Sequence, residues 1–306
     1  MRETEHRVAD YTLGIDGGGS KTDAVILDRD GRVVGAGIAG GCNVNFTPRR
    51  SAAAAYRRAI KSALRESGVT PEQIGKAGCT FGAVAKQVLE ELGITAVPRH
   101  FGEYLVAFER ARLSEPHGVA VVAGTGSLCV AVEHGQRTAA AGGWGPIFGD
   151  EGSGYDIGLQ GVKRALLASE GRAPDTALTA AMQEYFAEDR MRRAVGKLFS
   201  TSVNQPLTAG FSMEVSKAAE AGDAAAIEIL ESAGETLGEL AAFVARRIFT
   251  EDDVFPFVLA GGVFSIGRLV LDPIRGVLRP QFPKASIVIA DMRPGEAVAR
   301  LTMRGA

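Results

Sequence analysis

The sequence has few of the residues that build disulfide frameworks and metal clusters. It contains three cysteines, four histidines and one tryptophan among 306 residues. The three cysteines, Cys42, Cys79 and Cys129, are odd in number, far apart and without any C-x-x-C spacing. The sequence therefore supports neither a disulfide framework nor a metal cluster. This use of cysteine is typical of a reducing compartment, and a cytoplasmic location is expected.

An excess of one charge and long apolar runs are also missing. The net charge is −2, so no overall field would draw the chain to nucleic acid or to an anionic membrane. No run of 18 apolar residues occurs, and the opening "MRETEHRVAD" lacks the apolar centre of a signal peptide. We therefore expect neither nucleic acid nor a membrane as a partner.

Glycine, in contrast, is abundant, with 39 residues that gather in a few short segments. Such clusters indicate tight turns where the backbone approaches another group closely. Apolar residues make up 46% of the chain and charged residues 23%, which is ordinary for a globular protein. The length predicts two lobes or one large domain, and strands that alternate with helices predict an α/β fold.

The segment "TLGIDGGGSKTDAVILDRDG", residues 12–31, is the first glycine cluster. β-prone residues precede and follow the three glycines, and Asp30-Gly31 is a strong hairpin signal. The glycines therefore join two strands and do not open a helix. A P-loop would need lysine where Ser20 stands, and a dinucleotide-binding fingerprint would need glycine where Thr22 stands, so both motifs are excluded.

A glycine turn between strands can still bind phosphate, because consecutive N–H groups without neighbouring Cβ atoms can converge on one anion. Ser20, Lys21 and Thr22 could add hydroxyl donors and a positive charge. Asp16, at the end of the first strand, would repel a bare phosphate, but it suits a divalent cation between the carboxylate and a nucleotide. The alternative is a plain tight hairpin.

The same layout recurs in "GVAVVAGTGSLCVAVEHGQRTAAAGGWG", which begins at residue 118. Residues 124–127 correspond to residues 17–20, and the glycine pair 142–143 corresponds to 40–41. We interpret this as an internal structural repeat that gives two lobes, each with a glycine turn. Chance similarity of two glycine-rich hairpins is the alternative.

Helices are expected to alternate with these strands. Thr47 and Pro48 start one that stops at Gly68, and Asp175 is expected to cap another. The longest is predicted over residues 224–248, and "GEAVARLTM" is predicted to form the last.

Four segments occur in an order that resembles the BadF/BadG/BcrA/BcrD ATPase family and its N-acetylglucosamine kinase branch. They are the DGGGSKT of residues 16–22, AGTGS of 123–127, GGWGPIFGDEGSG of 142–154 and LAGGVF of 259–264. The resemblance implies a two-lobed actin-like ATPase fold, related to ribonuclease H, with a mixed five-stranded sheet in each lobe and the nucleotide between the lobes. It divides the chain into residues 1–112 and residues 113–306, with the last helix expected to pack across both lobes.

The resemblance also implies roles for individual residues. Asp16 would face Mg²⁺, and ATP would be the phosphate donor. The implied contacts with the ATP phosphates are Gly17, Gly18, Gly19, Ser20, Lys21, Thr22, Gly124, Thr125, Gly126 and Ser127. The implied contacts with adenosine are Gly261, Gly262 and Val263, and those with the sugar are Asn43, Gly143, Trp144, Gly145 and Asp150.

Each implied sugar contact has a purely structural alternative. Trp144, the only tryptophan, could be a core or interdomain anchor. Asn43 could only cap a turn. Asp150 and Glu151 could only cap the helix that starts near Gly154, where a helix N-terminus favours carboxylates.

The catalytic base is where the sequence departs from the family. The branch uses an Asp that opens a helix before the second glycine turn, and Glu103 stands at that place here. Glu103 would accept the proton of a sugar hydroxyl; the alternative is a helix-end carboxylate without chemistry. Glu109 lies further along the same helix and is expected to face solvent.

The sequence thus predicts an ATP-dependent kinase acting on an amino sugar such as N-acetylglucosamine or glucosamine. Two alternatives stay open. One is an ATPase that activates a partner enzyme, and the other is a nucleotide-binding or sugar-binding sensor without catalysis. A homodimer is expected from the resemblance alone.

Overall fold

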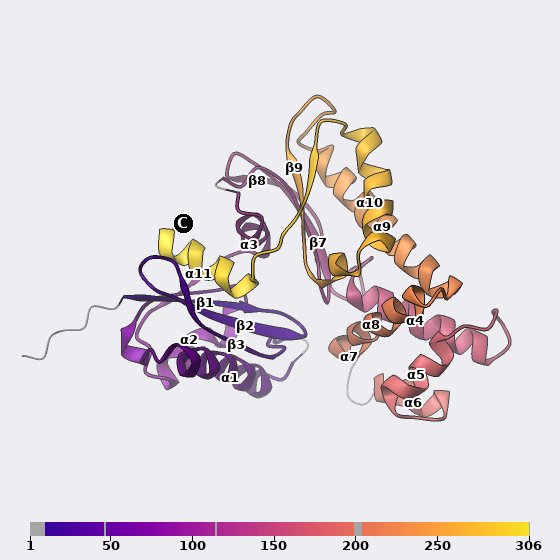
Figure 1. Ribbon diagram of the computed structural model, residues 1–306, viewed down its shortest axis with the longest axis horizontal. Helices are drawn as coiled ribbons and strands as arrows, with labels where there is room; N and C mark the ends of the chain where they lie inside the picture. Colours follow the sequence, from indigo (N-terminus) through magenta and orange to yellow (C-terminus); the bar gives the residue numbers. More distant parts are fainter. Residues whose placement is uncertain (1–9, 46, 114, 199–203, 306) are drawn as a thin grey trace, which may run out of the picture. The chain divides into compact units, whose positions relative to one another are not determined.

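The structure is a computed structural model that describes residues 10–45, 47–113, 115–198 and 204–305 (Figure 1). This part of the chain divides into two compact units, Met1–Leu113 with Asp291–Ala306 and Ser114–Ala290. The chain leaves the first unit one residue after the boundary expected from the sequence. The last helix belongs to the first unit, whereas the expected division placed residues 113–306 together.

The first unit is a mixed sheet of five strands with helices on both faces, in the order β3-β2-β1-β4-β5. Its elements are β1 (Tyr11–Gly17), β2 (Lys21–Leu27), β3 (Val33–Gly40), α1 (Arg49–Ser67), η1 (Pro71–Gln73), β4 (Ile74–Cys79), η2 (Gly82–Val84), α2 (Ala85–Glu91), β5 (Pro98–His100), α3 (Glu103–Arg110) and α11 (Pro294–Arg304).

Alternating side chains on β2 show how the two faces of this sheet are covered. Ala24 and Ile26 belong to the core formed with α1 and α2. Val25 and Leu27 point to the opposite face, where they pack with Ala299 of α11. In Figure 1, α1 and α2 accordingly lie on one side of the sheet and α11 on the other.

Glycines allow α11 to lie directly on the sheet. A Cβ on Gly14 of β1 would overlap the backbone of α11, with Ala299 Cα at 2.7 Å. A Cβ on Gly295 of α11 would lie 2.7 Å from the carbonyl oxygen of Asp23 in β2. Helix and sheet are therefore in backbone contact on this face.

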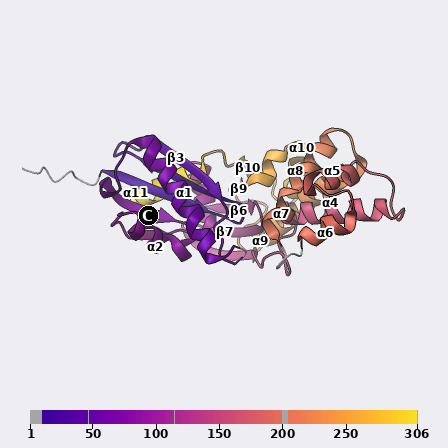
Figure 2. The same ribbon diagram turned by 90° about the horizontal axis from the view of Figure 1, so that it is seen from below.

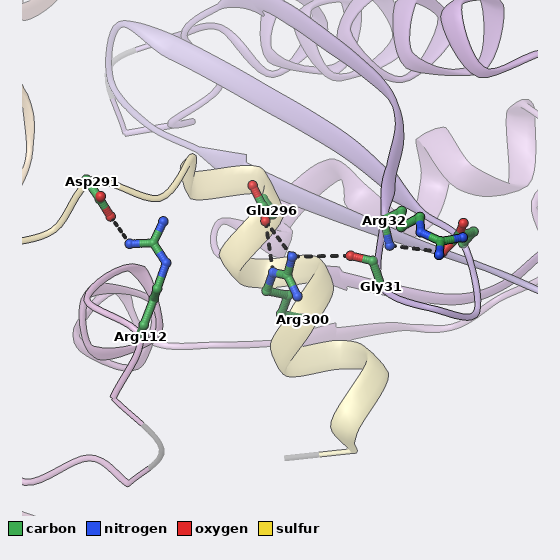
Figure 3. Close-up of polar contacts among 7 residues, drawn as sticks. Gly31, Arg32, Arg112, Asp291, Glu296 and Arg300 are labelled. Carbon is green, nitrogen blue, oxygen red and sulfur yellow. Dashed lines mark hydrogen bonds and ion pairs between the residues drawn. The ribbon is translucent and has the colours of Figure 1, made fainter.

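Polar contacts fix both ends of α11. Arg293, just before the helix, pairs with Asp23, whose side chain is 1% exposed, at 2.7 Å. Arg300 bridges Glu296 and the carbonyl oxygen of Gly31, and Arg112 pairs with Asp291 at the start of the same segment (Figure 3).

The second unit contains the other five-stranded sheet, in the order β10-β9-β6-β7-β8. Its elements are β6 (Gly118–Ala123), β7 (Ser127–Glu133), β8 (Gln136–Gly142), α4 (Gly154–Ser169), α5 (Leu178–Phe186), α6 (Met191–Leu198), α7 (Gln205–Gly210), α8 (Ser212–Glu220), α9 (Ala224–Ala245), β9 (Pro256–Ala260), η3 (Gly262–Ile266), α10 (Arg268–Gln281) and β10 (Ser286–Ile289).

One apolar core joins this sheet to its helices, including Val121 of β6, Leu237 of α9 and Ile274 of α10. Helices α4 to α8 lie together at one end of the unit (Figure 2). Within the described residues, no helix is both long and apolar enough to cross a bilayer.

The two sheets confirm the predicted repeat. In each unit, three consecutive strands form an antiparallel meander, a later strand pairs in parallel with the first of them, and a last strand pairs in parallel with that one. The glycine turns occupy the same position, between the first and second strands of each meander. The predicted two-lobed, mixed-sheet fold is therefore confirmed.

Two predicted helix caps are wrong. Pro48, not Thr47, stands at the N-cap of α1, although the stop at Gly68 is confirmed by its left-handed φ of 67°. The Asp175 side chain does not cap α5, which begins after Ala177. Asp223 accepts the Ala177 N–H instead, at 2.7 Å, and also caps α9.

Candidate functional site

The first glycine turn follows Asp16, the second-last residue of β1. The Thr80 hydroxyl, at the end of the adjacent strand β4, donates to Asp16 Oδ1 at 3.1 Å and accepts the Gly17 N–H at 2.8 Å. Gly18 N donates to the Lys21 carbonyl at 2.8 Å and closes the turn. Thr80 therefore fixes both the carboxylate and the first peptide of the turn.

The Asp16 carboxyl is an unfavourable place for an uncompensated negative charge. Burial raises its pKa to about 6, the Thr80 hydrogen bond opposes this rise, and the neighbouring Asp23 adds to it. The guanidinium of Arg110, at the end of α3, lies close enough to lower the pKa of Asp16. A cation beside Asp16 would stabilise the ionised carboxylate further.

The residues after the three glycines differ in what they can offer a ligand. Ser20 and Lys21 are exposed, whereas Thr22 is fully buried. The Thr22 hydroxyl already donates to the Gly40 carbonyl at 2.7 Å. Its predicted phosphate contact thus competes with an existing hydrogen bond, whereas Ser20 and Lys21 are accessible.

Cys42 packs directly beneath this turn. A Cβ on Gly17 would overlap its sulfur atom, and Cys42 N donates to the Gly18 carbonyl at 3.0 Å. Burial raises the pKa of the Cys42 thiol, so it behaves as a packing residue and not as a thiolate.

Glu103 follows β5, which is separated from β1 by β4, and it lies at the same sheet edge as Asp16. In the strand register, Ile15 of β1 pairs with Cys79 of β4, and Cys79 pairs with His100 of β5. Asp16, Thr80 and Phe101 are therefore at one level, with Glu103 two residues further on, as the first residue of α3. Glu103 is partly buried.

Helix α3 also connects Glu103 with Asp16 through Arg110. Glu103 and Arg110 are seven residues apart and therefore lie on the same face of the helix. Arg110 interacts electrostatically with Asp16, and its Nε donates to the Met292 carbonyl at 2.8 Å. Glu109, expected in solvent, is instead 5% exposed and paired with Arg304 of α11, so that expectation is wrong.

Asn43 lies beside the first glycine turn. Its N–H donates to the Gly18 carbonyl at 3.2 Å, and its Oδ1 accepts the Asn45 N–H at 3.0 Å. The turn-forming role is therefore present, while the predicted sugar contact stays a prediction.

The second glycine turn is held by the segment that leads into α4. Gly154 N donates to the Gly124 carbonyl at 2.8 Å, and Tyr155 N donates to the Thr125 carbonyl at 3.2 Å. The Ser127 hydroxyl donates to the Glu151 carbonyl at 2.8 Å. This turn is consequently held by two backbone contacts and one hydroxyl contact to the segment that precedes and begins α4.

Asp150 is 3% exposed and has a left-handed φ of 64°. Its Oδ1 accepts the Ser127 N–H at 3.1 Å, and its Oδ2 accepts the Gln205 amide at 3.1 Å. Neither Asp150 nor Glu151 caps α4, because Ser153 does so by accepting the Asp156 N–H. The cap alternative for these two carboxylates is therefore wrong.

The glycines predicted to contact adenosine lie at the same sheet edge as the second turn. Val122 of β6 pairs with Ala260 of β9, directly before Gly261. A Cβ on Gly261, whose φ is 129°, would overlap the Ala123 carbonyl group. The Val263 side chain is 4% exposed and belongs to the core, so only its backbone could meet a ligand.

The segment between β8 and α4 presents apolar side chains to solvent. Gly143 and Gly145 have positive φ angles of 75° and 82°, and Trp144 between them is 76% exposed. Ile147 and Phe148 are also exposed. Trp144 is therefore no core anchor within the second unit.

Three residues of these sites were missed by the sequence reasoning. Thr80, Arg110 and Gln205 each contact or influence a predicted residue through tertiary structure. Of the three, only Thr80 could have been identified from the sequence, because a hydroxyl residue at the carboxyl end of a parallel strand is well placed to contribute to a binding site.

The pKa of Asp16 predicts how stability depends on pH. Because the folded protein binds this proton more tightly than the unfolded chain, the ionised carboxylate destabilises the fold above pH 6. That cost disappears as the pH falls through 6 towards 4. Relative to Asp16→Asn, the wild type should gain about 2 kcal/mol of unfolding free energy between pH 7 and 4.

Urea unfolding at several pH values without divalent cations measures this difference. Asparagine has the same shape and does not titrate, so the difference between the two proteins isolates Asp16. A difference that stays constant across the range would contradict the raised pKa.

Comparison with known proteins agrees with the motif resemblance. The model of the BadF/BadG/BcrA/BcrD ATPase family matches residues 13–294. An N-acetylmuramic acid/N-acetylglucosamine kinase of Clostridium acetobutylicum is 27% identical over 91% of this chain and 93% of its own. Glucosamine kinase GspK of Vibrio cholerae is 29% identical over 72% of this chain and 76% of its own.

The fold is shared with solved structures. A putative N-acetylglucosamine kinase from Chromobacterium violaceum superimposes with a TM-score of 0.71 at 23% identity. The match covers 95% of this chain and 98% of that one.

Proposed function

Because this chain belongs to the BadF/BadG/BcrA/BcrD ATPase family, we propose that it is an ATP-dependent kinase of an amino sugar such as N-acetylglucosamine or glucosamine. One observation carries the proposal. The glycine turn with Asp16 follows β1 and the helix start with Glu103 follows β5, two parallel strands on either side of β4, so both lie at one sheet edge. A phosphate-binding turn and a carboxylate base are the two parts that this reaction requires.

We assign the following roles in the proposed reaction to the described residues. The glycine turns at residues 17–19 and 124–126 bind the phosphates of ATP and stabilise charge that develops during transfer. The N–H groups of Gly17, Gly18 and Gly124 already donate within the protein, so the phosphates are bound by other groups of these turns. Glu103 orients a sugar hydroxyl and accepts its proton. Gly261 and Gly262 border the adenosine, where the missing side chains leave the backbone open to a flat purine.

Mg²⁺ fits the environment of Asp16. The carboxylate is partly buried, and its charged form is disfavoured by that burial. Within residues 10–45, 47–113, 115–198 and 204–305, no cluster of three potential metal ligands occurs. This agrees with a magnesium ion held by one carboxylate, water and nucleotide oxygens. Bound there, it would neutralise phosphate charge.

The sugar contacts proposed are Asn43, Gly143, Trp144, Gly145 and Asp150. Exposed Trp144, on a segment with two left-handed glycines, offers an apolar surface for one face of a sugar ring. From the resemblance to the family, we also propose that the protein is cytoplasmic and forms a homodimer.

The alternative of an ATP-driven activator is disfavoured by the cysteines. The family resemblance implies a sister branch whose members activate a partner enzyme through an iron–sulfur cluster, for which they carry cysteines, usually as a pair. Here Cys42, Cys79 and Cys129 are all buried. Burial raises the pKa of each thiol, to about 11 for Cys79, which opposes the thiolate form that iron needs.

Release of ADP, measured with and without a panel of amino sugars and plain hexoses, tests the proposal. An amino sugar should stimulate release and appear as a sugar phosphate. Release that no sugar stimulates would favour the activator. Nucleotide binding without turnover would favour the sensor, and either result would overturn the kinase assignment.

A further inference from the structure

Gln205 is a buried polar residue to which the proposed chemistry gives no role. It is the first residue of α7, and it is 2% exposed. The Asn204 side chain caps this helix by accepting the Leu207 N–H at 3.1 Å. Gly158 lets α7 approach α4, since a Cβ there would overlap the Thr208 carbonyl. The position of Gln205 is thus fixed by its own helix.

A chain of hydrogen bonds leads from Gln205 to the second glycine turn. Gln205 Nε2 donates to Asp150 Oδ2 at 3.1 Å, and Ser127 N donates to Asp150 Oδ1 at 3.1 Å. Asp150 also fills the space next to Gly126, where a Cβ would lie 2.7 Å from Oδ1. The carboxylate therefore supports the end of the turn, and Gln205 supports the carboxylate.

The Gln205 amide is oriented at a cost in stability. Its Oε1 is the one buried side-chain N or O atom without a hydrogen-bond partner among the described residues. An ionised carboxylate only accepts hydrogen bonds, so the amide must turn its NH₂ to Asp150 and leave Oε1 unpaired. A buried acceptor without a donor destabilises a fold, and an apolar side chain of similar size would avoid this.

Asp150 shows a cost of the same kind. Its left-handed φ is rare for a residue with a side chain, and burial raises its pKa. The hydrogen bonds from Ser127 and Gln205 oppose that rise and stabilise the charged form. Local strain and an unpaired polar atom, at one turn, are characteristic of functional sites.

We propose that Gln205 is a positioning residue for ATP: it holds Asp150, which fixes Ser127 N–H and the 124–127 turn that binds the nucleotide phosphates. This inference rests on the nucleotide use proposed above and not on the identity of the sugar.

The substitution Gln205→Met tests it in the full-length protein. Affinity for a non-hydrolysable ATP analogue with Mg²⁺, measured by calorimetry, should fall about tenfold, the effect of losing one hydrogen bond to a charged group. The melting temperature should stay the same or rise, because the unpaired acceptor is gone. Unchanged affinity would overturn the proposal, and a parallel fall of affinity and melting temperature is resolved by hydrogen exchange.

Hydrogen exchange provides a local readout if the variant is less stable. Residues 124–127 should exchange faster in Gln205→Met, while Leu207 and Thr208 in α7 keep their protection. Equal loss in both segments would show a structural role alone and overturn the proposal.

Gln160→Met is the matched control. Gln160 also donates to an aspartate in the second unit, Asp156 at 3.1 Å, but it is exposed and this hydrogen bond stays within α4. The Gln160→Met variant should bind nucleotide with unchanged affinity. A tenfold loss of affinity in this variant would overturn the assignment to Gln205.

If the wild type binds nucleotide but transfers phosphate to no sugar, only the proposal of a sugar acceptor is refuted. A wild type that binds no nucleotide would refute both proposals.

Discussion

Glu103→Gln is expected to lower kcat for sugar phosphorylation by about 10²–10⁴-fold, the usual contribution of a general base. Glutamine keeps the size of the side chain and can still accept a hydrogen bond, but it cannot take the proton. Glu103 begins α3 at the sheet edge that carries Asp16, so the change leaves the glycine turn intact. Affinity for Mg-ATP should stay within about twofold of the wild type, because binding does not need the base.

Steady-state kinetics and nucleotide calorimetry on the same samples measure both quantities. Glu72→Gln is a suitable control, since Glu72 also lies in the first turn of a helix of the first unit, but it is exposed. Glu103→Asp should keep more activity than Glu103→Gln, because it retains the carboxylate and shortens it by one methylene. If Glu103→Gln retains the kcat of the wild type, another group accepts the proton.

The fold could be predicted because its signals are local. A glycine turn between two β-prone runs and the Asp30-Gly31 hairpin fix a meander, and the second meander repeats the pattern. The longest helix, predicted over residues 224–248, is observed as Ala224–Ala245. Such features depend on neighbours in sequence, so the sequence carries them directly.

The supporting residues of the site could not be predicted in the same way. Thr80 contacts Asp16 across 64 positions, and Gln205 contacts Asp150 across 55. Such pairs depend on strand register and on the packing of α7 against α4, which no local pattern specifies. Asp175 illustrates the converse, because a suitable local cap was displaced by Asp223 from a distant segment.

Gly14 shows what a local pattern leaves open about a residue. It belongs to the β-prone run before the three glycines, and the sequence does not show why glycine stands there. In the structure, however, it lies in β1 under α11, while Leu13 and Ile15 face the opposite core. Gly14 is thus a packing residue, and its mutation tests stability rather than phosphate binding.

Gly14→Ala is expected to lower the free energy of unfolding by about 3 kcal/mol, at the upper end of the usual overpacking cost. The added Cβ would meet backbone atoms of Ala299 and Gly295, which cannot move without shifting the whole of α11. Urea denaturation measures this loss, and hydrogen exchange over residues 294–304 should show α11 loosened first.

Gly40→Ala supplies the comparison that separates overpacking from a general effect of replacing glycine in a strand. Gly40 lies at the end of β3, and a Cβ there would have no heavy atom within 4 Å. Its unfolding free energy should therefore change by no more than about 0.5 kcal/mol. Similar losses in the two variants would contradict the packing argument. A large loss confined to Gly14→Ala would instead show that direct backbone contact with β1 holds the last helix on the first unit.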